Sequence, residues 1–455
     1  MAEAKRFGDP ISPSESISEF ADHGLPLSME ACAVHQMMNA ADSSIPFVST
    51  VYAEESAFLW LTRQTAIRFS GRPMSHIVEI EDRLEANIDG LRIAGEAGWQ
   101  ICLEALSWKE PGELFAAGVL AFEANDPKKI DKILAAAVVA PEAAGGVISA
   151  LGWVGYDRVK PIITKLIASK DFVHRRIGIG SSAVCREHPG AALAEAIKQD
   201  EPMLRARAIK AVGELGAQNL ILPVRLNLNS PDPLIRFWAA WACVIVADVP
   251  VAITALQEIA QSKSVFRERA ARLVPRRLDM AASMAWIKKL KGDPKQIRTA
   301  ILAAGALGTS TNVPWLIEQM SDLKLSRVAG ESLSMITGID LAKLDLERKP
   351  PENFESGPND DPNDENVDLD PDDWLPWPDP ALVQKWWTKN AGRFTANVRY
   401  LVGKPIDPAQ LRQVLIDGKQ RQRAAAAVEL AIRTPGKPMF EVRMPGFRQL
   451  AMLNR

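Results

Sequence analysis

Stretches of apolar residues recur along the middle of the chain with a period of about thirty residues. Each stretch has the spacing of a helix and is followed, after a joint of Gly, Asn, Asp or Pro, by a second helix-like stretch such as KPIITKLIAS or VPWLIEQMSD. One helix pair cannot bury its apolar face alone, so this period predicts a row of stacked helical hairpins. The eight predicted first helices begin at Leu114, Ala144, His174, Leu204, Leu234, Arg267, Ile297 and Ser326.

The segments that flank the repeats have other patterns. HIVEIEDRLEANIDGLRIAGEAGW has one apolar helical face and an opposite charged face, which indicates a structural helix. Beyond the repeats, NVRYLV and PMFEVRM alternate like short strands, and Asp407 before Pro408 has the pattern of a helix start. We expect this last region to cap the solenoid, because a terminal repeat needs a cover. The predicted divisions are an N-terminal extension (1–44), a helical region (45–110), about eight repeats (111–340), an acidic Pro/Trp loop (341–384) and a basic, mixed capping region (385–455).

Arginine recurs near the starts of the predicted first helices. One interpretation is that these side chains form salt bridges between repeats and hydrogen bonds to helix carbonyl groups. The alternative is a row of residues that binds a partner along an exposed ridge of the solenoid. We favour the first interpretation for the arginines at these positions, which are Arg175, Arg205, Arg236, Arg298 and Arg327.

Two resemblances follow from these motifs. The unit LRARAIKAVGELG resembles the HEAT-like repeats first catalogued in phycobilisome lyases, which implies an all-α solenoid over residues 111–340. The combination of YAEESAFLWLTRQTAIRF, EDRLEANIDGLRIAGEAGW, RVAGESLSMITGIDL, the acidic stretch and RYLVGKPI resembles an uncharacterised proteobacterial family of HEAT-repeat proteins that are often encoded near type VI secretion genes. That resemblance implies an adaptor, a loader or an immunity-type factor. Asn87 stands where the family has a histidine, so no role of that histidine carries over.

Composition is that of a soluble globular protein, with 47% hydrophobic and 24% charged residues. The N-terminal sequence MAEAKRFGDPISPSES has no apolar leader, and the longest apolar run, Phe237–Ala247, is shorter than the roughly 18 residues of a membrane span. Four scattered cysteines without a CxxC pair argue against a disulfide framework and against a zinc ribbon. We therefore expect a cytoplasmic protein that does not bind a membrane.

Charge is nearly balanced over the chain but segregated near its end. The formal net charge is −2, yet residues 350–384 contain 11 acidic and no basic residues, whereas residues 385–455 contain 14 basic and 4 acidic residues. Neighbouring blocks of opposite sign are expected to dock against each other. A basic block beside the chain's own acidic stretch is poorly suited to phosphate backbones, so we expect no nucleic-acid partner.

The acidic stretch GPNDDPNDENVDLDPDDWLPWPDP, residues 357–380, allows three interpretations. Asp368, Asp370 and Asp372 match positions 1, 3 and 5 of a calcium loop, although the glycine expected at position 6 is Asp373. A disordered linker would be poor in aromatic residues, whereas buried tryptophans would fix the second half of this stretch. We favour a fixed acidic surface that either neutralises the basic block or faces a basic partner. Its predicted partner-binding residues are Asp360, Asp361, Asp364, Glu365, Asp368, Asp370, Asp372, Asp373, Trp374 and Trp377.

The sequence shows no motif of a known catalytic class. HExxH, GxSxG and P-loop patterns are missing, and Cys185 and His188 form a lone CxxH pair without a second ligand pair. The sequence therefore predicts a non-catalytic scaffold without a cofactor that binds another protein. By resemblance, that partner is a secretion component, an effector or a toxin. The alternative is a calcium-dependent protein or an enzyme that uses the acidic loop.

Overall fold

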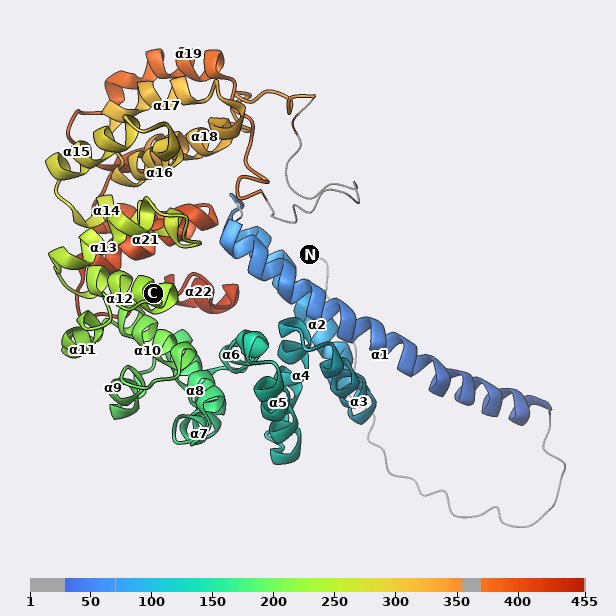
Figure 1. Ribbon diagram of the computed structural model, residues 1–455. Helices are drawn as coiled ribbons and strands as arrows, with labels where there is room; N and C mark the ends of the chain where they lie inside the picture. The colour runs from blue at the N-terminus through green and yellow to red at the C-terminus, as the bar shows by residue number, and fades with distance from the viewer. Residues whose placement is uncertain (1–28, 70, 353, 355–369, 454–455) are drawn as a thin grey trace, which may run out of the picture. The chain divides into compact units, whose positions relative to one another are not determined.

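The computed structural model describes residues 29–69, 71–352, 354 and 370–453 (Figure 1). Contacts divide the chain into two units, Met1–Phe47 and Val48–Arg455. Helix α1 (Met29–Phe69) begins in the first unit and ends in the second. All other helices and strands of the described residues belong to the second unit.

The repeats form two layers of helices, which confirms the predicted all-α solenoid. Each first helix of a hairpin contacts the first helix of the next hairpin, and the second helices pack beside them (Figure 1). The first helices are α4 (Pro111–Ala124), α6 (Ala144–Val154), α8 (Phe172–Val184), α10 (Pro202–Leu215), α12 (Pro233–Val246), α14 (Arg267–Arg277), α16 (Ile297–Leu307) and α18 (Leu323–Thr337). The second helices are α5 (Pro127–Val139), α7 (Tyr156–Ile167), α9 (Ala191–Ala196), α11 (Ile221–Arg225), α13 (Pro250–Ala260), α15 (Met280–Lys291) and α17 (Val313–Gln319).

Shorter and flanking elements complete the second unit. Before the repeats lie α2 (Met74–Ala94) and α3 (Glu96–Ala105), and after them lies α19 (Pro380–Asn390). The mixed C-terminal region contains β1 (Tyr400–Leu401), β2 (Lys404–Pro405), α20 (Pro408–Asp417), α21 (Gln420–Arg433) and α22 (Gly446–Leu453). Single 3-10 turns occur at η1 (Leu106–Trp108), η2 (Pro141–Ala143), η3 (Gln218–Leu220), η4 (Pro294–Gln296), η5 (Ser310–Asn312) and η6 (Ala391–Arg393).

Several helices begin with an acidic residue followed by proline. Asp232 accepts hydrogen bonds from the backbone N–H groups of Leu234 and Ile235 at 2.8 and 3.1 Å. Proline at the first helical position has no N–H group, and none is needed there. Asp379 and Asp407 cap α19 and α20 in the same way, and the helix start predicted at Asp407 is confirmed.

Small residues let consecutive first helices approach each other closely. A Cβ atom at Gly146 on α6 would lie 2.0 Å from the carbonyl oxygen of Pro111 on α4. A Cβ atom at Gly118 would lie 2.9 Å from the Cβ atom of Ala150. The apolar side chains around these contacts are almost fully buried, so added volume would push the two helices apart.

Helix α12, which carries the longest apolar run of the sequence, is buried in this core. Among the described residues, no single helix combines the length and the apolar composition needed to cross a membrane. The segments Pro127–Val139 and Pro141–Val154 reach that length and composition only together, across a bend of 117°.

The C-terminal segment, defined here as residues 394–453, packs along the carbonyl ends of the first helices. At α18, the N–H group of Val402 donates to the carbonyl oxygen of Met335 at 2.8 Å. At α16, Arg399 Nε donates to the carbonyl oxygen of Leu307 at 2.9 Å. The last carbonyl groups of a helix have no partner within the helix, so these contacts satisfy groups that would otherwise be exposed or unpaired.

The same segment continues past earlier repeats. The N–H group of Met439 donates to the carbonyl oxygen of Glu214 near the end of α10, at 2.9 Å. Arg448 Nη2 donates to the carbonyl oxygen of Trp153 near the end of α6, at 2.6 Å. The predicted mixed C-terminal region is therefore present. It does not cover the last repeat alone, because it also runs back along earlier repeats as far as α6. The strand predicted for PMFEVRM is wrong, because residues 438–444 have no strand partner within the described chain.

Two glycines make the close approach of this segment possible. Gly308 follows α16 with φ 79°, and a Cβ atom there would lie 2.3 Å from the carbonyl oxygen of Tyr400. Gly338 follows α18 with φ 72°, and its Cβ atom would lie 2.7 Å from the carbonyl carbon of Val402. Any other residue would be strained in this conformation and would collide with the C-terminal segment.

Glu429 on α21 is the most buried acidic contact between the C-terminal segment and the repeats. Its side chain is 1% exposed and accepts a hydrogen bond from Arg276 Nη1 of α14 at 2.9 Å. Arg399 also donates to Glu429, and Arg433 Nη2 lies 3.5 Å from it. One buried carboxylate is thus the shared counter-ion of three guanidinium groups, those of Arg276, Arg399 and Arg433.

Glu268 on α14 links two consecutive repeats. It accepts hydrogen bonds from Arg298 Nε of α16 at 2.6 Å and from Arg272 Nη1 at 3.1 Å. Burial works to raise the pKa of Glu268, but the charges and hydrogen bonds of Arg272 and Arg298 outweigh it and hold this pKa at about 2.

We predict that Glu429→Gln lowers the free energy of unfolding by about 3 kcal/mol, because the buried charges of Arg276 and Arg399 lose their counter-ion. Urea unfolding followed by circular dichroism measures this change. Glu258→Gln is the control, since the exposed pair of Glu258 and Arg236 contributes at most about 1 kcal/mol. Equal effects of the two substitutions would contradict the account of Glu429.

We also predict that stability depends on the ionisation of Glu268. Folding lowers its pKa from 4.5 to about 2, so its contribution is present above about pH 4.5 and is lost as the pH falls from there towards 2. The contribution amounts to at most about 3 kcal/mol. Unfolding free energies of the wild type and of Glu268→Gln, measured at about pH 6 and about pH 3, should differ more at the higher pH. A difference that does not change with pH would refute the prediction.

Candidate functional site

The structure places only part of the predicted acidic surface. Asp360, Asp361, Asp364, Glu365 and Asp368 lie outside the described residues. Asp370, Asp372, Asp373, Trp374 and Trp377 are described, and they form a turn beside the last repeats followed by a segment that leads to α19.

Asp370 and Asp372 pair with arginines of the repeats. Both carboxylate oxygens of Asp372 accept hydrogen bonds from Arg298, at 2.6 and 2.7 Å, and the Asp372 side chain is buried. Arg327 donates to the carboxylate of Asp370 and, at 3.2 Å, to the carbonyl oxygen of Asp372. Such two-pronged contacts between guanidinium and carboxylate groups fix geometry as well as charge. The turn is therefore held rigidly against α16 and α18.

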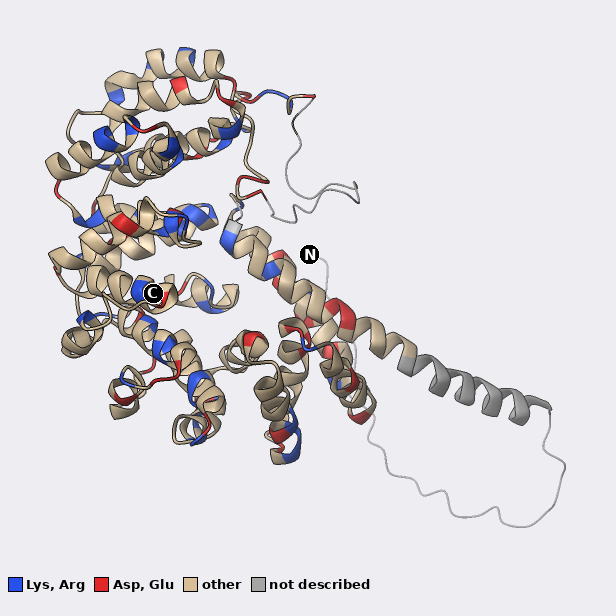
Figure 2. Cartoon of the chain, in the orientation of Figure 1, with Lys and Arg blue, Asp and Glu red and all other residues tan. Residues whose placement is uncertain are grey.

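The expected docking of the two charged blocks is wrong for Asp370 and Asp372, since their partners belong to the repeats. Arg421, from the basic block, donates to the carbonyl oxygen of Pro371 at 3.0 Å and to Glu331 of α18 at 2.7 Å. Figure 2 shows Lys and Arg residues distributed over the repeat helices as well as over the C-terminal region. Two of the helix-start arginines make the predicted kinds of contact. Arg298 bonds to Glu268 of the preceding repeat, and Arg236 Nε donates to the carbonyl oxygen of Leu228 at 3.2 Å.

The tryptophan half of the stretch is fixed, as predicted. Trp377 is 7% exposed, packs edge-on against Phe354 with ring centroids 4.7 Å apart, and lies 4.5 Å from the guanidinium of Arg327. Trp387 on α19 is also buried. Trp374 is the exception, because it is 68% exposed on a backbone with φ 68°.

The described carboxylates do not favour a metal ion. Asp370 and Asp372, which a calcium loop would need, already neutralise Arg327 and Arg298. Across the part of the chain that the structure describes, no group of three or more His, Cys, Asp or Glu side chains is arranged to hold a metal.

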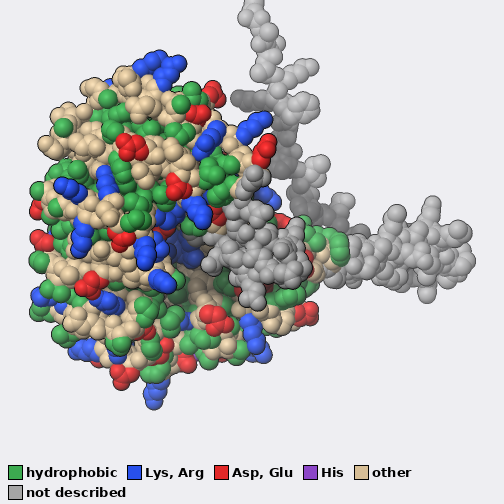
Figure 3. All heavy atoms as spheres, turned by 45° about the horizontal axis from the view of Figure 1, so that its top comes forward, with side chains coloured by type: hydrophobic (Ala, Val, Ile, Leu, Met, Phe, Trp, Pro, Cys, Tyr) green, Lys and Arg blue, Asp and Glu red, His purple; other side chains and the backbone are tan. Residues whose placement is uncertain are grey.

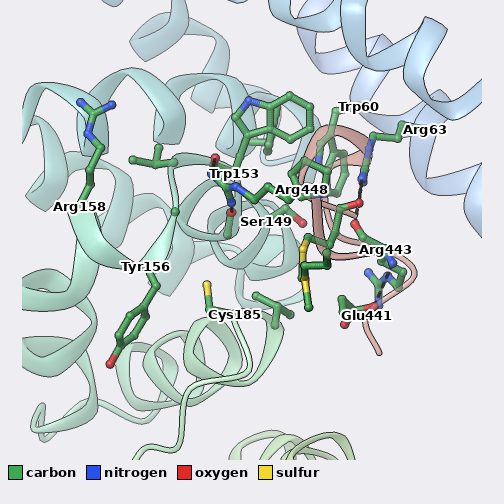
Figure 4. Close-up of a pocket in the computed structure, with 18 of the residues that line it drawn as sticks. Trp60, Arg63, Ser149, Trp153, Tyr156, Arg158, Cys185, Glu441, Arg443 and Arg448 are labelled. Atoms are coloured by element: carbon green, nitrogen blue, oxygen red, sulfur yellow. Dashed lines mark hydrogen bonds between the residues drawn. The ribbon is translucent and has the colours of Figure 1, made fainter. Parts of the chain in front are cut away.

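A pocket of about 500 Å³ lies elsewhere, between the repeats and the C-terminal segment (Figure 4). Trp60 and Arg63 of α1 line one wall, Trp153 of α6 and the nearby Ser149 line another, and the C-terminal segment closes a third through residues 441–452. The volume is in the usual range for ligand pockets. Because segments far apart in the sequence build it, no sequence motif could have predicted it.

One ion pair and several hydrogen bonds to backbone groups hold the wall of this pocket in place. Arg63 Nε donates to Glu81 Oε1 of α2 at 2.6 Å, and Arg63 Nη2 donates to the carbonyl oxygen of Arg443 at 2.8 Å. The other carboxylate oxygen of Glu81 accepts the N–H group of Gly446 at 2.6 Å. These contacts attach the C-terminal segment to α1 and α2. In contrast, two N–H groups are buried with no hydrogen-bond partner among the described residues: Nε of Arg443 and the indole Nε1 of Trp60.

The pocket offers no activated nucleophile. Burial raises the pKa of the Cys185 thiol to about 11, so this thiol stays protonated at neutral pH. Burial also raises the pKa of Tyr156. The lining combines aromatic and methionine side chains with guanidinium groups, which suits binding better than acid–base chemistry.

One protein-family model agrees with the repeat architecture over part of the chain. Residues 190–274 match the family model described as HEAT repeats. An engineered protein whose crystal structure was determined by the Northeast Structural Genomics Consortium is 13% identical, with a TM-score of 0.31, and the match covers 63% of this chain and 93% of that one. No curated protein matches the sequence. Residues 190–274 are thus similar to HEAT repeats and lie within the longer row of stacked helical hairpins. Repeats of this kind are typical of scaffolds that bind other proteins.

Proposed function

We propose that this protein is a non-catalytic scaffold that binds another protein, and that the turn at residues 370–374 makes part of the contact. The observation that carries the proposal is Trp374, a large aromatic side chain that is 68% exposed next to the exposed Asp373. Tryptophan is among the residues that contribute most to binding energy at protein interfaces. Its exposure at a tight turn therefore suggests a contact with a partner.

The rigidity of the turn supports the same proposal. Asp372, two residues before Trp374, is buried in its paired contact with Arg298, and Trp377, three residues after it, packs on Arg327. A side chain that is held in place before binding loses little conformational freedom on binding, which favours affinity. Of the ten predicted partner-binding residues, Asp373 and Trp374 are the described ones that remain exposed.

The resemblance to proteins encoded near type VI secretion genes supports a finer role. We propose an adaptor, a loader or an immunity-type factor of a bacterial type VI secretion system, acting in the cytoplasm. A secretion component or an effector as the partner would support an adaptor or a loader. A toxic domain as the partner would support an immunity factor.

Trp374→Ala is predicted to reduce capture of the specific partner at least about tenfold without lowering the melting temperature, because the side chain makes few contacts within the chain. Affinity purification from the native host, with the partner identified by mass spectrometry, measures the loss. Trp108→Ala is the matched control, since Trp108 is 74% exposed at a different place in the second unit. Equal capture by both variants and the wild type would argue against this role of the turn.

A further inference from the structure

Two arginines of the second unit carry charge that no described residue pairs with. Arg68 near the end of α1 and Arg269 on α14 are exposed, and neither forms a hydrogen bond or an ion pair with any described residue. Most arginines nearby are neutralised. Arg272, one helical turn after Arg269, contacts Glu268 and Glu331, and Arg63 contacts Glu81.

A third guanidinium group connects these two arginines to the pocket. Arg443 Nη2 donates to Gln64 Oε1 at 3.3 Å, and Gln64 lies one helical turn before Arg68 on the same face of α1. Both Gln64 and Arg443 line the pocket. The nearest acidic residue of the C-terminal segment, Glu441, is already paired with Arg186 at 3.2 Å. Arg68 and Arg443 therefore lie on either side of Gln64 at the edge of the pocket. The charges of both lower the pKa of Arg269 on α14, which puts its guanidinium group within electrostatic reach of theirs.

Their electrostatic environment agrees with this placement. Arg68 and Arg269 are exposed in part, while surrounding protein covers the rest of each side chain. This partial burial and the charge of Arg443 both lower the pKa of Arg68. Burial, followed by the charges of Arg68, Arg443 and Arg272, lowers the pKa of Arg269. Like charges that are held together repel one another, so the folded chain keeps an arrangement that costs stability unless an anion is bound. Figure 3 shows a hollow bordered by Lys and Arg side chains on one face of the molecule.

The pocket adds two hydrogen-bond donors and an apolar surface to these charges. Trp60 Nε1 and Arg443 Nε are buried N–H groups without an acceptor among the described residues, and leaving such groups unpaired is unfavourable. Phe115, Trp153 and Met444 supply apolar lining. An occupant that fits must present hydrogen-bond acceptors, negative charge and at least one apolar group.

We propose that Arg68, Arg269 and Arg443 bind an acidic segment of a protein partner, and that an apolar side chain of this segment enters the adjoining pocket. The proposal rests on the proposed function in that it takes the partner to be a protein. It assigns that partner a second contact, separate from the Trp374 turn. A phosphate polymer fits less well, because a run of phosphates calls for a broad basic track, whereas this chain has a formal net charge of −2 and, of these three arginines, only Arg443 lines the pocket.

Fluorescence anisotropy on the full chain tests the proposal, with a fluorescein-labelled poly-glutamate peptide that carries one central leucine. We expect saturable binding that weakens with added salt, about tenfold weaker binding for Arg68→Gln and for Arg269→Gln, and weaker binding of the same peptide with serine in place of leucine. Neither substitution should lower the melting temperature, because each removes repulsion and no contact within the chain. Arg412→Gln, an exposed arginine on α20, should bind as the wild type does.

Three outcomes would overturn the proposal. The first is equal binding by the wild type, Arg68→Gln and Arg269→Gln. The second is tighter binding of oligothymidylate, which would assign the hollow to phosphate polymers. The third is peptide binding that appears only after deletion of residues 357–369, which would make the chain's own acidic stretch the occupant. Trp374→Ala should leave peptide affinity unchanged, so failure of this site and failure of the proposed function are distinguishable.

Discussion

The repeat row depends on how the carbonyl ends of its first helices are satisfied. The last carbonyl groups of each helix have no partner within the helix, and stacking brings these ends to one side of the row. In this chain the C-terminal segment passes them in reverse order, from α18 and α16 through α10 to α6, and supplies N–H groups and arginine side chains. In a simple solenoid each repeat contacts only its neighbours. Here the last residues of the chain connect repeats that are far apart.

This connection also determines which surfaces are left for partners. The C-terminal segment covers the carbonyl ends of the repeats. The carboxylates of Asp370 and Asp372 are paired with Arg327 and Arg298, so they are not available to a partner. Two surfaces stay available: the rigid turn with the exposed Trp374, and the exposed arginines Arg68 and Arg269, which have no ion-pair partner among the described residues. The two surfaces have different chemistry, one aromatic and acidic, the other basic, which would allow one partner to be recognised at two places.

Local patterns predicted the helices, whereas contacts between distant residues decided the site. The thirty-residue period identified all eight first helices. Asp407 before Pro408 identified a helix start, because a capping signal acts within a few residues. Likewise, buried tryptophans predicted that the segment around Trp377 is fixed. The pairing of Asp372 with Arg298, and the path of residues 438–444 along α10, are set by three-dimensional packing. No spacing in one sequence encodes such contacts, so the pocket and the unpaired arginines could not be foreseen.

Hydrogen exchange on a chain truncated after Asn390 tests the central claim most directly. The truncated chain keeps all eight repeats and α19 but lacks the C-terminal segment. If that segment holds the row together, backbone amides in the first helices from α6 to α18 lose protection together, including those far from the truncation. Protection that stays at its full-length level in α6 and α10 would contradict the account, since the repeats would then be stable through contacts between neighbours alone.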